Sequence, residues 1–91
     1  MKVFIWGTGA MASDYLSKQE ITDEDLLGFI ETRKTKDYFE GKKVFEPQEI
    51  AKLDSYDYIL VCIKNVGREI YQLCKEMKID VDKLILMDNW E

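Results

Sequence analysis

The sequence predicts an α/β domain built on a five-stranded, mostly parallel sheet with helices on both faces. Short apolar runs of strand length alternate along the chain with segments whose apolar residues have helical spacing. Near-continuous apolar strands are typical of sheets covered on both faces, and their alternation with helices favours parallel pairing. The 91 residues suffice for one small domain and not for two. Right-handed crossovers then give half of a doubly wound, three-layer α/β/α fold with strand order 3-2-1-4-5.

The first predicted strand and helix flank a glycine-rich turn. Val3–Trp6 is an apolar run rich in β-branched and aromatic residues, and it ends at Gly7-Thr8-Gly9. Helical apolar spacing predicts a helix from Ala10 to about Lys18, followed by an acidic linker over residues 20–25. The second predicted strand is Leu26–Ile30.

The middle of the chain is more polar. The string from Glu31 to Lys36 predicts a loop rich in positive charge. Gly41-Lys42-Lys43 predicts a turn into a brief third strand, Val44–Phe45. Pro47 favours the start of a short helix that ends at Leu53, because the N–H that proline lacks is not needed in the first turn.

The last third of the chain contains the clearest strand. Tyr58–Ile63 is a continuous apolar run, which predicts a fourth strand buried on both faces. Apolar residues at helical spacing predict a helix from Asn65 or Val66 to Met77. Leu84–Met87 is the fifth predicted strand, and the sequence contains no internal repeat or interdomain linker.

The composition excludes several classes of function. Thirteen Lys and Arg against eighteen Asp and Glu give a net charge of -5, which argues against tracking of a nucleic-acid backbone. The chain has no His, so a His-based catalytic triad and a His-rich zinc site are excluded. Cys62 and Cys74 lie outside any CxxC spacing and are interpreted as core residues. The carboxylates are scattered, and no catalytic constellation is predicted.

The sequence shows no targeting or membrane signal. The chain reaches Gly7 before an apolar signal-peptide region is possible. The apolar runs are far shorter than the roughly 20 residues that span a bilayer. We therefore expect a cytoplasmic location with reduced thiols and no membrane span.

The glycine-rich turn is a candidate phosphate site. The segment from Gly7 to Ala12 matches the pattern Gly-x-Gly-x-x-Ala between a strand and a helix. Gly7 would permit the tight turn, Gly9 would let a phosphate approach the backbone, and Ala12 would let the helix lie close to the sheet. The alternative is an ordinary tight turn that uses glycine without a ligand.

An acid at the end of the second strand is a candidate ribose ligand. Glu31 lies 24 residues after Gly7, where a carboxylate would accept hydrogen bonds from a ribose diol. Arg33 and Lys34 follow and offer an alternative contact to a phosphate. The competing interpretation is a solvated loop.

Polar residues also follow the fourth strand. Lys64, Asn65 and Arg68 would line the carboxyl edge of the sheet, where open α/β sheets bind ligands. Asn65 is equally compatible with a helix N-cap, and both roles can coexist. The segment 88–91 would either hang over the same cleft or lead into a following segment. The candidate nucleotide-binding residues are Gly7, Thr8, Gly9, Ala10, Met11, Ala12, Glu31, Thr32, Arg33, Lys64 and Asn65.

The chain resembles a Rossmann-like nucleotide-binding domain found at the N-terminus of bacterial surface-sugar enzymes. The shared motifs are a strand into Gly-x-Gly, then Gly-Phe-Ile-acid, Gly-x-x-Val and Asp-x-Ile-x-Val-x-Ile. They stand here as Ile5–Gly9, Gly28–Glu31, Gly41–Val44 and Asp57–Ile63. Such proteins include sugar acyltransferases, nucleotide-sugar epimerase/dehydratases and sugar-cluster methyltransferases.

The resemblance implies that Gly7, Gly9 and Glu31 hold a nucleotide. Similar proteins carry catalysis on a second domain, whereas this chain stops after the fifth predicted strand, so no independent enzyme is expected. The leading hypothesis is a binding module for a nucleotide-sugar or NAD(P)-type ligand in surface-polysaccharide metabolism. One βαβαβ half favours a mononucleotide or nucleotide-sugar over a full dinucleotide. The alternative is a non-catalytic module for homodimerisation or for docking to a fused or partner catalytic domain.

Overall fold

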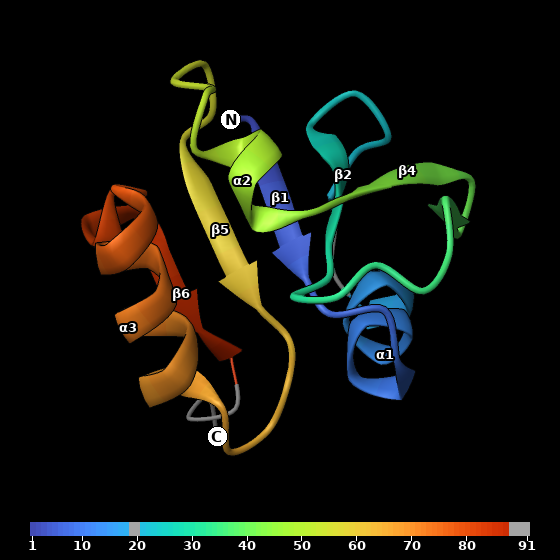
Figure 1. Cartoon of the computed structure of the whole chain (residues 1–91). Helices are drawn as coiled ribbons and strands as arrows, with labels where there is room; N and C mark the ends of the chain where they lie inside the picture. The colour runs from blue at the N-terminus through green and yellow to red at the C-terminus, as the bar shows by residue number, and fades with distance from the viewer. Residues whose placement is uncertain (19–20, 88–91) are drawn as a thin grey trace.

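A computed structural model describes residues 1–18 and 21–87 of the chain (Figure 1). The strands are β1 (Val3–Trp6), β2 (Leu26–Ile30), β3 (Tyr38–Phe39), β4 (Lys42–Phe45), β5 (Tyr58–Val61) and β6 (Leu84–Leu86). The helices are α1 (Ala10–Lys18), α2 (Pro47–Ile50) and α3 (Gly67–Met77), with a 3₁₀ turn, η1 (Val81–Lys83), before β6. All six strands form one mixed sheet in the order β3-β4-β2-β1-β5-β6.

The centre of the sheet is β1, which pairs in parallel with β2 and β5. Ile5 lies opposite Phe29 on one side and Leu60 on the other. The outer pairs β2–β4 and β5–β6 are also parallel, whereas β3 and β4 are antiparallel. Every residue of β1 is buried, as a continuous apolar run predicts for a strand with neighbours on both sides.

Alternate strand residues belong to two separate hydrophobic clusters. Phe4 and Trp6 pack in one cluster with residues of α2 and α3, including Ile70. Val3 and Ile5 pack in the other cluster with residues of α1. Because successive side chains of a strand point to opposite faces, α1 covers one face of the sheet and α2 with α3 covers the other.

The predicted α/β class with a mostly parallel sheet is confirmed, and several predicted boundaries need correction. The bounds of β1, α1 and β2 are as predicted. In contrast, α2 ends at Ile50 and not at Leu53, because the chain turns there with a hydrogen bond from Leu53 N to Ile50 O. The other shifts are of one or two residues: β4 begins at Lys42, β5 ends at Val61, α3 begins at Gly67 and β6 ends at Leu86.

The prediction of five strands in the order 3-2-1-4-5 is wrong in strand count, because a sixth strand extends the sheet. The sequence predicts no strand at Tyr38–Phe39, but these residues pair antiparallel with Lys42 and Lys43. Glu40 and Gly41 connect the two strands with φ values of 50° and 80°. Positive φ at both loop residues is typical of two-residue hairpin turns. Apart from β3, each predicted strand has the neighbours that the sequence indicated.

Among the described residues, no helix has the length and apolar character needed to cross a membrane.

Candidate functional site

Backbone hydrogen bonds bring the carboxyl ends of four parallel strands to one edge of the sheet. The N–H of Gly7 donates to the carbonyl of Ile30 (2.9 Å), and the N–H of Cys62 donates to the carbonyl of Trp6 (2.9 Å). The N–H of Glu31 donates to the carbonyl of Phe45 (3.0 Å). The segments after β1, β2 and β5 therefore start side by side, as the sequence predicted from a parallel sheet.

Gly7 is required by the close approach of β1 to β5. Its φ of 124° lies in a region that L side chains rarely adopt. A Cβ at this position would lie 2.7 Å from Cγ1 of Ile63 and 2.8 Å from the carbonyl oxygen of Cys62. A carbonyl oxygen of the neighbouring strand cannot move without disturbing the sheet, so any larger residue would strain this edge.

Gly9 has a different environment. A Cβ built on Gly9 would meet no atom within 4 Å, so the space in front of this residue is open. The first intrahelical hydrogen bond of α1 runs from Ser13 N to Gly9 O (3.1 Å). The N–H groups of residues 10–12 precede that bond, and a helix N-terminus favours an anion in front of such groups. Ala12 itself is fully buried against the sheet, which is the packing position that the sequence indicated.

An open cavity of about 450 Å³ lies in front of this turn. Its size falls within the range of small-molecule sites, roughly 300–1,000 Å³. Nine of the eleven predicted site residues line it, namely Gly7, Thr8, Gly9, Ala10, Met11, Glu31, Thr32, Arg33 and Lys64. The structure thus gathers residues from three separate segments around one cavity.

Cys62 and Ile63 also line the cavity, although the sequence indicated only a core role for them. Cys62 is 2% exposed, and burial raises the pKa of its thiol to about 11. At neutral pH this thiol is therefore protonated and unreactive, and Cys62 only lines the cavity. Its place directly after β5, next to Gly7, is the signal that could have identified it.

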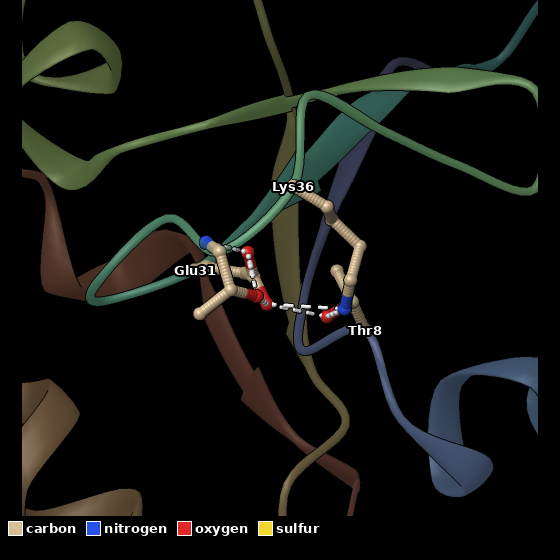
Figure 2. A network of polar contacts seen from close by, with 4 residues as sticks. Thr8, Glu31 and Lys36 are labelled. Atoms are coloured by element: carbon tan, nitrogen blue, oxygen red, sulfur yellow. Dashed lines mark hydrogen bonds and ion pairs between the residues drawn. The ribbon is translucent and has the colours of Figure 1, made fainter.

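Glu31 lies at the centre of a polar network that joins the glycine-rich turn to the loop after β2. Figure 2 shows Thr8, Glu31 and Lys36 pointing toward one another. The hydroxyl of Thr8 donates to Oε2 of Glu31 (2.6 Å), and the backbone N–H of Thr35 donates to Oε1 (2.8 Å). The hydroxyl of Thr35 lies 3.2 and 3.1 Å from the two carboxylate oxygens. We call Thr8, Glu31, Thr35 and Lys36 the Glu31 network.

Lys36 supplies the positive charge of this network. Its Nζ lies 2.8 Å from Oγ1 of Thr8 and 3.4 Å from Oε2 of Glu31. Desolvation by burial acts to raise the pKa of Glu31, but the hydrogen bonds from Thr8 and Thr35 and the charge of Lys36 outweigh it and lower the pKa to about 2. The carboxylate is thus ionised throughout the physiological pH range. Neither Thr35 nor Lys36 was among the predicted site residues.

The remaining candidates lie at the rim. The indole N–H of the buried Trp6 donates to Oγ1 of Thr32 (3.2 Å), which anchors the loop after β2. Arg33 and Lys64 are exposed, and neither forms an ion pair with another residue in the described part of the chain. Two cations therefore stand at the mouth of the cavity.

Asn65 and Arg68 lie outside this cavity lining. The predicted N-cap role of Asn65 is wrong, because Val66 is the N-cap of α3. Asn65 has a φ of 65°, whereas N-cap residues have a negative φ, as Val66 does with −122°. The segment 88–91, for which the sequence left two positions open, lies outside the described residues.

A smaller cavity of about 230 Å³ adjoins the first. The two cavities share Thr32 and Ile63. The rest of the smaller cavity is lined by α3 and its N-terminal flank, with an apolar wall of Val66, Ile70 and Leu73 beside the charged Glu69. Within residues 1–18 and 21–87, no group of three or more His, Cys, Asp or Glu side chains is arranged to hold a metal ion.

A third feature lies away from this edge, beside β6. A groove of about 380 Å³ is lined mainly by apolar side chains, namely Met1, Val3, Tyr15, Ile21, Tyr58, Leu60, Ile85 and Met87. This is the kind of surface that the alternative hypothesis of a docking module requires.

A comparison with known families places the chain in one of them. The model of the family described as C2185-like, N-terminal, matches residues 1–85. The chain belongs to this family. The match to this C2185-like family includes the glycine-rich turn, the Glu31 network and all six strands up to Ile85. A comparison with curated proteins finds no significant match.

Proposed function

We propose that this chain is a Rossmann-like, three-layer nucleotide-binding domain that holds a nucleotide-sugar or an NAD(P)-type ligand by its phosphate at the Gly7-Thr8-Gly9 turn. The observation that carries the proposal is the cavity at the carboxyl edge of the parallel sheet, onto which this turn and the start of α1 open. Open α/β sheets bind their ligands at this edge.

The local charges favour a phosphate. The N-terminus of α1 contributes roughly 0.3 to 1 kcal/mol toward an anion, and up to about 2 kcal/mol where it is partly buried. Arg33 and Lys64 line the same cavity and add two positive charges at its rim. The net charge of -5 is spread over the whole chain, and salt screens exposed charges beyond about 8 Å. Glu31 lines the cavity as well, but Lys36 pairs with its carboxylate, so these local charges favour an anion at the turn despite the acidic net charge.

The adjoining cavity offers room for the rest of the ligand. Its apolar wall, with the hydroxyl of Thr32 at the junction, suits a base or a sugar ring. We favour a mononucleotide or a nucleotide-sugar, because a dinucleotide usually bridges two βαβαβ halves. In this proposal the domain binds the ligand for surface-polysaccharide metabolism, and catalysis comes from a fused or partner domain of epimerase/dehydratase, transferase or methyltransferase type.

A titration of ¹⁵N-labelled protein tests the proposal. The ligands are UDP, UDP-sugars, AMP, NAD(H) and NADP(H), and the readout is the set of amide shifts. We expect saturable shifts confined to residues 7–12, 31–33 and 62–64. Absence of shifts at millimolar concentrations of every ligand would contradict nucleotide binding.

The groove beside β6 supports a second candidate function, homodimerisation. Tyr58 is 38% exposed in this groove, and β6 has a free sheet edge within the described residues. In this case a second copy of the chain would cover the apolar groove. Sedimentation equilibrium of the wild type and of Tyr58→Lys tests it: a dimer that the substitution dissociates supports this function, and a monomeric wild type at high micromolar concentration contradicts it.

A further inference from the structure

All hydrogen-bond acceptor positions of the Glu31 carboxylate are already occupied by donors of the protein. An ionised carboxylate offers about four lone-pair positions. Four donor groups already surround it: the hydroxyl of Thr8, the N–H and hydroxyl of Thr35, and the ammonium of Lys36. A ribose diol that bound here would have to displace one or more of these donors.

Replacing these donors with a ribose diol would add little binding free energy. Thr35 holds Glu31 through both its backbone and its side chain, so it can leave only if the loop after β2 changes conformation. Lys36 can leave more easily, because its distance of 3.4 Å to Oε2 is longer than the 2.7–2.9 Å of a strong charge-assisted hydrogen bond. Its departure would nevertheless exchange a charged donor for a neutral hydroxyl.

The contacts of Glu31 instead hold the glycine-rich turn. Thr8 is the central residue of that turn, and its 2.6 Å hydrogen bond joins it to a side chain 23 positions further along the chain. The side chain of Glu31 is only 13% exposed, whereas that of Lys36 is 39% exposed. The charge of Lys36 compensates the carboxylate, which would otherwise repel a phosphate at the neighbouring turn.

We infer that Glu31 is a positioning residue, which fixes the glycine-rich turn through Thr8, and that the site selects its nucleotide through the phosphate with no preference for a ribose 2′-hydroxyl. This inference rests on the proposed function and narrows it. It replaces the ribose contact that the sequence suggested for Glu31 with a contact inside the protein.

The first arm of the test uses the free protein, so it does not depend on any ligand. ¹⁵N relaxation is measured for the wild type, Glu31→Gln and Asp37→Asn. Asp37 is the matched control, because it is an acid of the same loop whose carboxylate pairs with Lys34 (3.3 Å). In Glu31→Gln we expect the order parameters of Thr8 and Gly9 to fall from about 0.85 to below about 0.6, with no change in Asp37→Asn. Unchanged order at Thr8 and Gly9 in Glu31→Gln would overturn the positioning role.

The second arm compares ligands with and without the 2′-hydroxyl. The dissociation constants of UDP and 2′-deoxy-UDP, and of AMP and 2′-deoxy-AMP, are measured for the wild type. We expect each pair to agree within about twofold. A ribose hydroxyl that donates a hydrogen bond to a carboxylate contributes about 1.5 kcal/mol or more to the binding free energy. This corresponds to at least a tenfold difference in affinity.

The two arms separate the possible failures. A tenfold preference of the wild type for the ribonucleotide would overturn the inference while the proposed function stands, and loss of that preference in Glu31→Gln would assign it to Glu31. Binding of no nucleotide would contradict the proposed function and the ligand preference together, and the relaxation data would still decide the positioning role.

Discussion

The pH dependence of stability offers a direct measure of the Glu31 network. The folded state lowers the pKa of Glu31 from 4.5 to about 2, so folding favours the ionised carboxylate. Its contribution to stability is fully present above about pH 4.5 and is lost as the pH falls toward 2. This lowering of the pKa corresponds to about 3 kcal/mol for a carboxylate shielded from water. Because the network lies at the mouth of an open cavity, screening by water reduces the expected value to about 1–2 kcal/mol.

Glu31→Gln keeps the shape of the side chain and removes its charge. We expect this variant to lose about 1–2 kcal/mol of unfolding free energy at pH 7, which corresponds to roughly 4–16 °C in Tm for a domain of this size. The deficit relative to the wild type should shrink between pH 4.5 and pH 2, where the wild-type carboxylate takes up its proton.

Urea denaturation followed by circular dichroism at pH 7, 5, 4 and 3 provides the assay. Asp37→Asn, which removes an exposed carboxylate of the same loop, is the control and should change stability by less than about 0.5 kcal/mol. A Glu31→Gln variant as stable as the wild type at pH 7, or a deficit that does not vary with pH, would refute this account of the network.

Three further predictions concern two glycines at the edge of the sheet and the two buried cysteines. Gly7→Ala should destabilise the fold by about 2–4 kcal/mol in urea denaturation, because its Cβ would meet Ile63 and the Cys62 carbonyl at an unfavourable φ. Gly9→Ala should cost less than about 1 kcal/mol, because its Cβ enters open space and only the preference for glycine over alanine at a helix N-cap is lost; an equal loss in both variants would contradict the geometry. Cys62 and Cys74 should not react with a thiol reagent such as DTNB at pH 7 until the protein unfolds, because both are buried with the pKa raised to about 11; rapid reaction of the native protein would contradict their burial.

Local signals explain why the first half of the sheet could be predicted. The apolar run of β1 and the glycine turn are both contiguous in the sequence, and the bounds of β1, α1 and β2 follow from them. In contrast, β3 has two residues, of which Tyr38 is 69% exposed. This strand depends on the turn at Glu40 and Gly41 and on pairing with β4. Neither of these produces an alternation of apolar residues that could be recognised in the sequence.

The lining of the site could be predicted because parallel strands end at a common edge, which the strand order alone determines. The Glu31 network could not be predicted in the same way. It depends on the side-chain conformations of Thr8 and Lys36, which are 28 positions apart and meet only once the loop after β2 is folded. The error at Asn65 has a similar origin, because a left-handed residue delays the start of α3 until Gly67.

The central claim is that a ligand phosphate binds in front of Gly9, and two isosteric substitutions test it most directly. Gly9→Asp and Gly9→Asn add side chains of nearly equal size to the same open space, and only the aspartate adds a negative charge. Two like charges about 4 Å apart repel by about 1–4 kcal/mol near a protein surface, so we expect Gly9→Asp to bind UDP-sugar or NAD(P) at least about fivefold more weakly than Gly9→Asn in calorimetric titrations. Equal affinities of the two variants, with both folded, would contradict a phosphate at this turn.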